Sequence, residues 1–555
     1  MSSFAHSPGV LEKNVHGSSD IIVSSKGVVN GLSDIPNDGS DFGPDTTLNA
    51  TSPNQTGVPY TQTGGIMETV NYSSANGQKE IKLTEGVFNI STTISITSSH
   101  IHIKGEGNNI IMPLSSFSGN AYGDCIVIDV DKAGFLEDIT IDGLSFDFAN
   151  ISAGSLIEGI HVKYTGGATT LEYYNIKLKN ISGYNLPSYS TTYYNNNAVI
   201  YVTATNSTPV LSQGVIIEDF FAINCWIAIA FYGASGLIIN NATILEGTNM
   251  GIATAPNSLD QSVNFGPTTL MNLSNLTIMN VENALPYGIS AGLVISGSGW
   301  NINNVVVQGY GIGASLSNIE GGGICTLSNA SLLINSGIGI KVTGSSDTYA
   351  FPIQLTNVAS TNNGNGTGGG TGATGSGVYI LNASPIFTSC SFITNKGYGI
   401  YKDNTASGYT PKIKIINTVF DESGLNGNGS GPIYIGTNQS ADEVVFYSTN
   451  PRYLPAPTLS ANPPVSGTVY QNTNPYDIRL KIPITYNPTS TAAATLATGI
   501  SITSPPTTST KVSIPAGLTA ADGQILTYDL VIPAGWYFEL IATNAVIGTA
   551  EVQAA

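Results

Sequence analysis

The chain has 555 residues, and its 36 aspartates and glutamates outnumber its 18 lysines and arginines, which gives a formal net charge of −18. An acidic chain without a basic patch cannot neutralise phosphates, so we expect neither nucleic acid nor an anionic membrane surface as a partner. The sequence has no apolar run long enough for membrane insertion. Hydrophobic residues make up 41% and charged residues only 10%, which indicates a folded protein with a surface of hydroxyl and amide groups.

The N-terminal part, residues 1–76, is predicted to be an arm followed by a cap. Residues 1–35 show little periodicity, and the first residues lack the charged and apolar regions of a signal peptide. Turn residues follow, and Gly64–Tyr72 has the pattern of a short helix. We expect this helix to cover the first coil of the repeats that come next, because the ends of stacked repeats need caps.

Residues 77–446 repeat one short phrase, an alternating apolar run that ends in a polar residue and an asparagine. Met271–Asn275 and Trp300–Asn304 are examples, and the phrase returns every 22 to 39 residues. Alternating runs predict strands, and units that cannot bury their own apolar face must stack. The sequence therefore predicts a parallel β-helix with one column of ladder-forming asparagines. The predicted column contains Gly143, Asn180, Asp219, Asn241, Asn275, Asn304, Asn329, Asn357, Cys390 and Asn417.

The first coils also carry family motifs: Asp38-Gly39, Asp45-Thr46, Thr63–Glu68, Gly86–Ile90 and Ile103–Gly107. Their order resembles the beginning of the pectate-lyase-like right-handed β-helices, a group that includes the tailspikes of many viruses. The resemblance covers about residues 36–440. It implies a right-handed parallel β-helix but no particular chemistry, because this fold hosts lyases, hydrolases and plain binding proteins.

Three charged residues precede successive members of the asparagine column. If the column points into the core, Asp142, Lys179 and Glu218 form one outer stripe. The two carboxyl groups would then lie two coils apart, and flexing could bring them into the separation of ~6.5–9.5 Å used by inverting glycoside hydrolases. In the alternative interpretation Lys179 bridges two acids in a surface charge ladder that stabilises little.

Other chemistries lack the residues they need. No arginine lies in the predicted β-helix, so the arginine-base lyases of this superfamily are not expected. His161 is the only histidine after residue 103, and we expect no histidine triad around it. The acidic residues of Glu137–Asp147 leave a calcium site open, although we expect no metal and no cofactor. The four cysteines have no metal-ligand spacing and are expected to be buried thiols.

A long spacer before Asp219 holds four tyrosines beside Asn195–Asn197. Loops on a rigid scaffold are where binding usually occurs, and tyrosine rings can stack on sugar rings. We therefore predict a binding region formed by Lys179, Tyr184, Tyr189, Tyr193 and Tyr194.

The pattern changes after the repeats end. Residues 447–466 are a Pro-rich linker, and 467–555 show short alternating strands that fit a β-sandwich. Within them Gly467–Tyr476 and Pro533–Tyr537 resemble terminal modules of surface proteins from viruses of archaea and other microbes. Large aromatics there favour an interface between chains, so we expect a homo-oligomer, namely a trimer.

These features together predict a virion surface spike or appendage, located on the particle or outside the cell. Its expected partners are host-surface glycans or glycoproteins and other virion proteins. One alternative is a polysaccharide depolymerase with Asp142 and Glu218 as acid and base. The other is a cellular adhesin or surface-layer-associated protein. We expect a binding protein rather than an enzyme.

Overall fold

The fold is known from a computed structural model. It describes residues 20–27, 40–77, 80–133, 135–164, 172–188, 197–204, 213–233, 236–246, 248–254, 270–280, 290–318, 323–344, 353–365, 372–403, 413–420, 428–435, 444–446, 462–472, 477–487, 493–514, 524–533 and 535–554. Among these residues no helix is long and apolar enough to cross a membrane.

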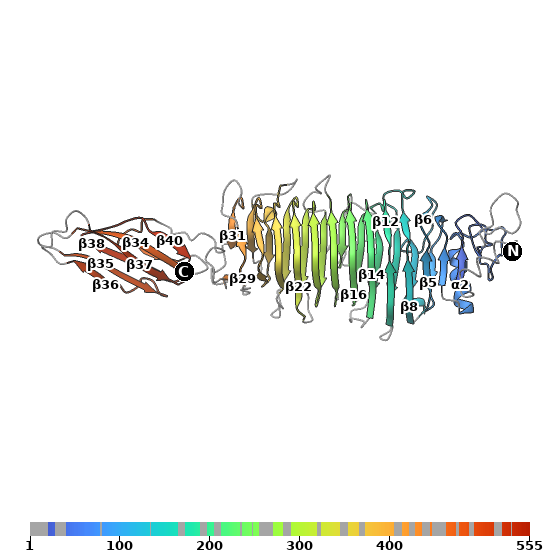
Figure 1. Ribbon diagram of the computed structural model, residues 1–555, viewed down its shortest axis with the longest axis horizontal. Helices are drawn as coiled ribbons and strands as arrows, with labels where there is room; N and C mark the ends of the chain where they lie inside the picture. The colour runs from blue at the N-terminus through green and yellow to red at the C-terminus, as the bar shows by residue number, and fades with distance from the viewer. Residues whose placement is uncertain are drawn as a thin grey trace, which may run out of the picture.

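The strands from residue 20 to residue 446 pair in parallel and stack into two long sheets (Figure 1). The 20-stranded sheet contains β1 (Asp20–Val23), β2 (Glu80–Leu83), β3 (Gly86–Ile90), β5 (His102–Gly105), β6 (Asn109–Pro113), β8 (Phe135–Asp142), β9 (Ser145–Asp147), β11 (Glu172–Lys179), β12 (Ser182–Tyr184), β14 (Gln213–Ile223), β16 (Leu237–Leu245), β18 (Asn272–Met279), β20 (Asn301–Gln308), β22 (Cys325–Leu333), β24 (Ile353–Thr361), β26 (Ile386–Thr388), β27 (Ser391–Ile393), β29 (Ile413–Ile416), β30 (Val419–Phe420) and β32 (Val444–Phe446).

The second long sheet has 12 strands. They are β4 (Ile94–Ile96), β7 (Asp124–Asp129), β10 (Glu158–Tyr164), β13 (Ala198–Ala204), β15 (Ile227–Tyr232), β17 (Met250–Ala253), β19 (Ala291–Gly297), β21 (Ile312–Asn318), β23 (Ile338–Gly344), β25 (Val378–Leu381), β28 (Tyr398–Asp403) and β31 (Gly431–Ile435). Two short helices, α3 (Val130–Ala133) and η1 (Ala373–Gly375), lie in the connections. The predicted parallel β-helix is confirmed.

The predicted asparagine column marks a corner of the β-helix. Apart from Cys390, its members from Asn180 to Asn417 have left-handed backbone conformations with φ between 48° and 61°. Asparagine tolerates this conformation better than most residues, because its short polar side chain can hydrogen-bond locally. The corner divides the 20-stranded sheet. We call the strand segments before the column the first face, those after it the second face, and the 12-stranded sheet the third face.

The assumption that the column points into the core, from which the outer stripe was derived, is wrong. Asn240 and Asn241 are both exposed, whereas Ile239 and Ala242 on either side of them are buried. The left-handed residue interrupts the alternation of the strand, so two successive side chains face solvent. The ladder bonds therefore lie outside: Asn304 Nδ2 donates to Asn275 Oδ1 over 2.7 Å, and Asn357 Nδ2 donates to Asn329 Oδ1 over 2.7 Å.

Cys390 was assigned to this column wrongly. Thr356 pairs with Thr388, so the residue that corresponds to Asn357 is Ser389. Ser389 has a φ of 53° and is therefore the left-handed residue of this coil. Cys390 is the next residue and is buried. Burial raises the pKa of the Cys390 thiol to about 11 and that of Cys225 to about 12. All four cysteines are free and buried, as predicted.

An inward ladder exists at a different corner, in the later coils. Asn335, Asn363, Asn395 and Asn428 are fully buried. Asn335 Nδ2 donates to Asn363 Oδ1 over 2.9 Å, and Asn363 Nδ2 donates to Asn395 Oδ1 over 2.8 Å. Asn395 Nδ2 donates to Asn428 Oδ1 over 3.1 Å. Each buried amide thus satisfies the hydrogen-bonding groups of its neighbours.

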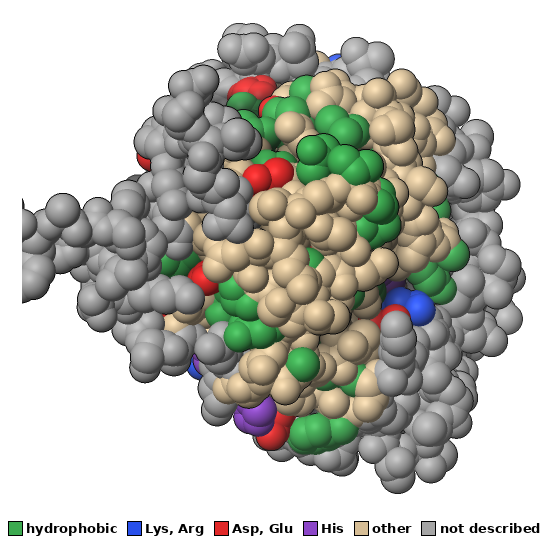
Figure 2. Space-filling view, turned by 90° about the vertical axis from the view of Figure 1, so that its right-hand side faces the viewer, with side chains coloured by type: hydrophobic (Ala, Val, Ile, Leu, Met, Phe, Trp, Pro, Cys, Tyr) green, Lys and Arg blue, Asp and Glu red, His purple; other side chains and the backbone are tan. Residues whose placement is uncertain are grey.

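The predicted capping helix is confirmed as α2 (Ile66–Asn76), which buries Ile66 and Val70 against the first coil. Figure 2 looks onto this end of the β-helix, where the described surface is mostly uncharged with scattered acidic groups. The carboxylate of Glu68 is buried and accepts hydrogen bonds from Thr61 Oγ1 and Thr63 Oγ1, which hold the helix to the preceding loop. Strand β1 pairs with β2, so Asp20–Val23 of the predicted arm belongs to the stack.

The C-terminal strands form two antiparallel four-strand groups. One contains β33 (Val469–Gln471), β35 (Ala494–Ser501), β36 (Ser509–Ile514) and β38 (Tyr537–Thr543); the other contains β34 (Ile478–Tyr486), β37 (Gln524–Ile532), β39 (Ala545–Ile547) and β40 (Glu551–Ala554). Side chains of both groups share one apolar core, including Ile482, Leu496 and Phe538. This unit is the predicted β-sandwich.

Candidate functional site

The first face brings the predicted charged stripe together. Lys179 pairs in register with Asp142 on one side and with Glu218 on the other. The residues before them, Ile141, Leu178 and Ile217, are buried, so the three charged side chains point outward. The row continues through Asn240, Ser274, Asn303, Ser328 and Thr356 in the following strands. We call this run, from Asp142 to Thr356, the polar row.

The two acids of the stripe have different partners. Lys179 Nζ lies 2.5 Å from Glu218 Oε2, with about a third of each side chain exposed. The hydrogen bond to Glu218 and the charge of that carboxylate raise the pKa of Lys179. Asp142 Oδ1 accepts a hydrogen bond from Asn180 Nδ2 over 2.7 Å. This geometry is that of a surface charge ladder, and it leaves Glu218 bound to an ammonium group.

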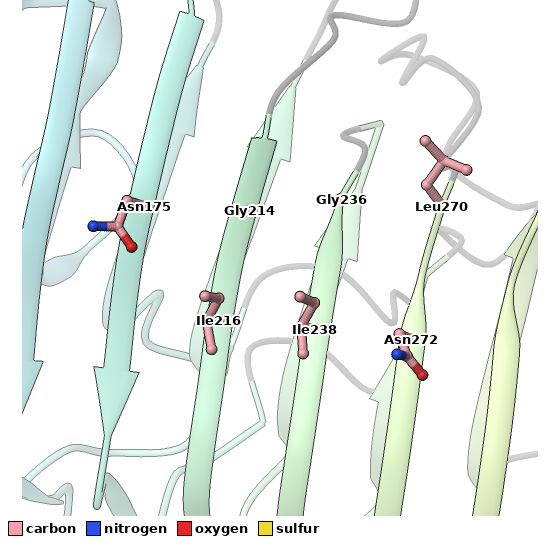
Figure 3. Close-up of a pocket in the computed structure, with 7 residues that line it drawn as sticks. All are labelled: Asn175, Gly214, Ile216, Gly236, Ile238, Leu270 and Asn272. Atoms are coloured by element: carbon pink, nitrogen blue, oxygen red, sulfur yellow. The ribbon is translucent and has the colours of Figure 1, made fainter.

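A shallow groove lies beside the polar row, on the same strands (Figure 3). Ile216 and Ile238 pair across β14 and β16 and form its floor, and Ile238 is 40% exposed. Both isoleucines lie two residues before the polar row, about 6.6 Å along the strand. The groove has a volume of about 480 Å³ and is lined by Asn175, Gly214, Ile216, Gly236, Ile238, Leu270 and Asn272.

The glycines at the edge of the groove keep it open. Gly214 and Gly236 have φ values of 91° and 79°, which other residues rarely adopt. Leu270 adopts φ 55° in the corresponding turn and is 63% exposed, so its side chain forms an apolar wall. This groove was not predicted from the sequence. Its signal was a pair of isoleucines at outward positions of strands whose other outward residues are mostly polar.

Of the predicted binding tyrosines, the structure describes one. Tyr184 ends β12 on the second face, and its ring centroid lies 5.8 Å from that of Phe221. Tyr189, Tyr193 and Tyr194 lie outside the described residues. The acids of the possible calcium site do not converge. Asp138 faces His100 and His102, and Asp147 accepts from Asn185.

A second polar cluster lies on the third face and is completely buried. Asp124 of β7 pairs in register with Glu158 of β10, and His161 follows on the same strand. His161 Nδ1 lies 3.0 Å from Asp124 Oδ1 and 3.4 Å from Glu158 Oε2. His161 Nε2 lies 2.7 Å from Thr203 Oγ1 of β13. The sequence predicted no histidine triad around His161, and it gave no indication of these two acidic partners.

Burial and charge act in opposite directions within this cluster. Burial raises the pKa of Glu158 well above its usual range, and the charge of Asp124 adds to the effect. Burial also disfavours the charged form of Asp124, but the charge and hydrogen bond of His161 outweigh it and lower that pKa. The sequence signal was a Glu-x-x-His on one strand. The partner aspartate is 34 residues earlier (158 − 124), so the cluster could not be recognised without the register.

No protein-family model matches the chain, and the search of curated proteins finds no match. Among solved structures, the chain is similar to the A-module of the mannuronan C-5 epimerase AlgE4 of Azotobacter vinelandii, with 12% identity, a TM-score of 0.43, and coverage of 68% of this chain and 94% of that one. A mutant tailspike of the E. coli bacteriophage HK620 shows 14% identity, a TM-score of 0.44, and coverage of 98% and 94%.

A third similar structure is the tailspike gp49 of the Acinetobacter baumannii bacteriophage Fri1, described as a capsular polysaccharide depolymerase. It shows 12% identity, a TM-score of 0.34, and coverage of 89% of this chain and 84% of that one. At these identities the likeness concerns the fold alone. The parallel sheets described above establish that fold independently.

Proposed function

We propose that the chain is a surface spike or appendage protein of a virus particle, and that it binds host-cell glycans through the first face of its β-helix. The observation that carries the proposal is the apolar groove beside the polar row. The row offers amide, hydroxyl and charged groups at the strand spacing of ~4.8 Å. Sugars need both kinds of contact: hydrogen-bond partners for their hydroxyl groups and an apolar surface for the C–H faces of their rings.

The charge of the chain narrows the class of glycan. The net charge is −18, and Lys179, a cation next to the groove, is held by Glu218. An acidic polysaccharide would be repelled by such a field, whereas a neutral one would not. We therefore propose neutral polysaccharides, or the neutral glycans of host glycoproteins, as the ligands.

Binding without cleavage fits the geometry of the stripe better than hydrolysis. A general acid must deliver a proton to the glycosidic oxygen, and its pKa is usually raised for that purpose. The carboxylate of Glu218 instead lies 2.5 Å from the ammonium group of Lys179, so it is held in an ion pair rather than placed to deliver a proton to a substrate. The depolymerase hypothesis, with Asp142 and Glu218 as acid and base, therefore stays the second candidate.

The test combines binding and turnover. Purified chain would be applied to an array of neutral and acidic microbial glycans, and the bound polysaccharides would then be incubated with it and analysed for released oligosaccharides. We expect retention of neutral glycans and no release. Release by the wild type that Glu218→Gln abolishes, with binding intact, would establish the depolymerase instead.

The location on a virus particle needs its own measurement. Mass spectrometry and antibody labelling of purified particles should find the chain on their surface, in contact with other virion proteins. Finding the natural protein on its own cell's surface with no virus present would support the adhesin or surface-layer alternative. In that case the glycan-binding face would keep its role in a different setting.

A further inference from the structure

We propose that Asp124, Glu158 and His161 bind a divalent metal ion of the first transition row, with Zn²⁺ as the best match, on the outer side of the third face. Two oxygen ligands and one imidazole nitrogen are a donor set that Zn²⁺ accepts. Among the described residues, this is the group of histidine, cysteine and acidic side chains with metal-ligand spacing, and its ligand atoms lie within 4.8 Å of one another.

The two distances from His161 Nδ1 to the carboxylate oxygens match the edges of a coordination polyhedron. Ligands at ~2.1 Å from a zinc ion are separated by about 3.0 Å at right angles and by about 3.4 Å in a tetrahedron. His161 Nδ1 lies 3.0 Å from Asp124 Oδ1 and 3.4 Å from Glu158 Oε2. An ion could therefore enter between these atoms with small shifts of the side chains.

Glu158 supplies the independent observation. Its side chain is fully buried, and as a carboxylate neither of its oxygens has a donor within hydrogen-bond geometry; its polar neighbours are His161 Nδ1, 3.4 Å from Oε2, and the Asp124 carboxyl, to which it can bond only when protonated. A buried carboxylate without a partner is costly, and such groups are normally paired or coordinate a metal. The side chain points toward His161 Nδ1, where the ion would lie.

The surroundings hold the ligands in place. His161 Nε2 lies 2.7 Å from Thr203 Oγ1, so a hydrogen bond from Nε2 to Thr203 would leave the lone pair of Nδ1 free for a metal. Asn120 Nδ2 donates to Asp124 Oδ2 over 2.7 Å and fixes the other side of that carboxylate. Such second contacts are typical of metal sites, because they orient the ligands. The ring of Tyr201 lies 4.7 Å from that of His161 and adds to the burial.

The ion would have a structural role and would link β7 to β10. The cluster lies on the third face and is buried, whereas the proposed glycan groove is on the first face and open. The proposal is therefore independent of the proposed function. The competing state has no metal: Glu158 is protonated and bonds to Asp124.

The test measures zinc in the full-length chain after expression with added ZnCl2 and extensive washing with a weak chelator. We expect about one zinc ion per chain, as for a single three-ligand site. Removal of zinc with EDTA should lower Tm, and ZnCl2 should restore it. Replacement by Co²⁺ should give visible absorption bands of a nitrogen- and oxygen-bound ion, which report coordination directly.

Two glutamate variants complete the test. Glu158→Gln should reduce the zinc content to background and abolish the Tm shift. Glu137→Gln is the matched control, since Glu137 also lies 3.4 Å from a histidine nitrogen but is 43% exposed. It should keep zinc. Should Glu158→Gln fail to fold, the zinc content, the Tm shift and the Co²⁺ spectrum of the wild type still decide.

Two results would overturn the proposal. One is a wild-type chain with no more zinc than Glu158→Gln and the same Tm in ZnCl2 and in EDTA. The other is zinc loss in Glu137→Gln but not in Glu158→Gln, which would place the ion at the exposed histidines.

Discussion

The inward asparagine ladder predicts a large and local cost for one small substitution, Asn363→Ala. Asn363 Oδ1 accepts from the backbone N–H of Asn335 over 3.0 Å and from its Nδ2 over 2.9 Å. Both donors are buried and would lose their partner. Each unsatisfied buried donor costs about 1–3 kcal/mol, so the pair would cost about 2–6 kcal/mol.

The matched control is Asn357→Gly in the outer column. Asn357 also donates to an asparagine of the previous coil, but it is exposed and water can replace the lost bond. Its φ of 54° suits glycine, so we expect a loss below about 1 kcal/mol.

Hydrogen exchange and thermal unfolding would measure both variants. Because repeat proteins open coil by coil, the amide of Asn335 and its neighbours should lose protection first in Asn363→Ala, while the first coils keep theirs. If Asn363→Ala unfolds within about 0.5 kcal/mol of the wild type, the reasoning on the buried ladder is wrong, since a typical unsatisfied donor costs more than that.

Three further predictions concern the surface, the thiols and the assembly. Lys179→Ala should leave the urea midpoint of unfolding essentially unchanged, because the pair with Glu218 is exposed; a clearly lower midpoint would mean that the pair holds the coils together. The pKa values of Cys225 and Cys390, raised by burial to about 12 and 11, predict no reaction with a thiol reagent at pH 8 until denaturant is added; fast labelling of the native chain would contradict this. We also expect a trimer that depends on residues 467–555, so light scattering should give a trimeric mass for the full chain and a lower one for residues 1–450; a monomeric full chain would exclude self-association.

The sequence predicted the fold because each coil repeats the same physical requirement. A strand must turn at a corner, asparagine tolerates the left-handed conformation there, and the apolar residues before it must face the core. The position of Asp142, Lys179 and Glu218 in one outer row followed from this repeat. The direction of the asparagines did not, because strict alternation was assumed through a residue that interrupts it. Ser389 was missed because serine, unlike asparagine, aspartate or glycine, gives no signal for a left-handed conformation.

The two candidate sites, the groove on the first face and the buried cluster on the third face, could be predicted only in part, for different reasons. The groove forms because Ile216 and Ile238 are neighbours on an outer face of the β-helix. The sequence shows that these residues are apolar, but it does not show which outward side chains stay exposed to solvent. The buried cluster depends on the pairing between β7 and β10, and the sequence separation of paired strands on this face varies from coil to coil. The register between distant strands depends on loop lengths as well as on the repeat. The sequence pattern therefore did not predict that Asp124 lies beside His161.

The measurement that tests the account most directly is glycan binding by variants of the first face. Ile238→Asn replaces an apolar side chain in the groove, and Ile386→Asn makes the same change in the same outward row, outside the groove. Equilibrium binding to the neutral polysaccharide retained best on the array would be compared for both and for the wild type. We predict that Ile238→Asn weakens binding at least about tenfold, or ~1.4 kcal/mol, since it removes most of an apolar contact. Ile386→Asn should bind like the wild type. Equal affinities for all three proteins, or selective loss in Ile386→Asn, would contradict a glycan site at this groove.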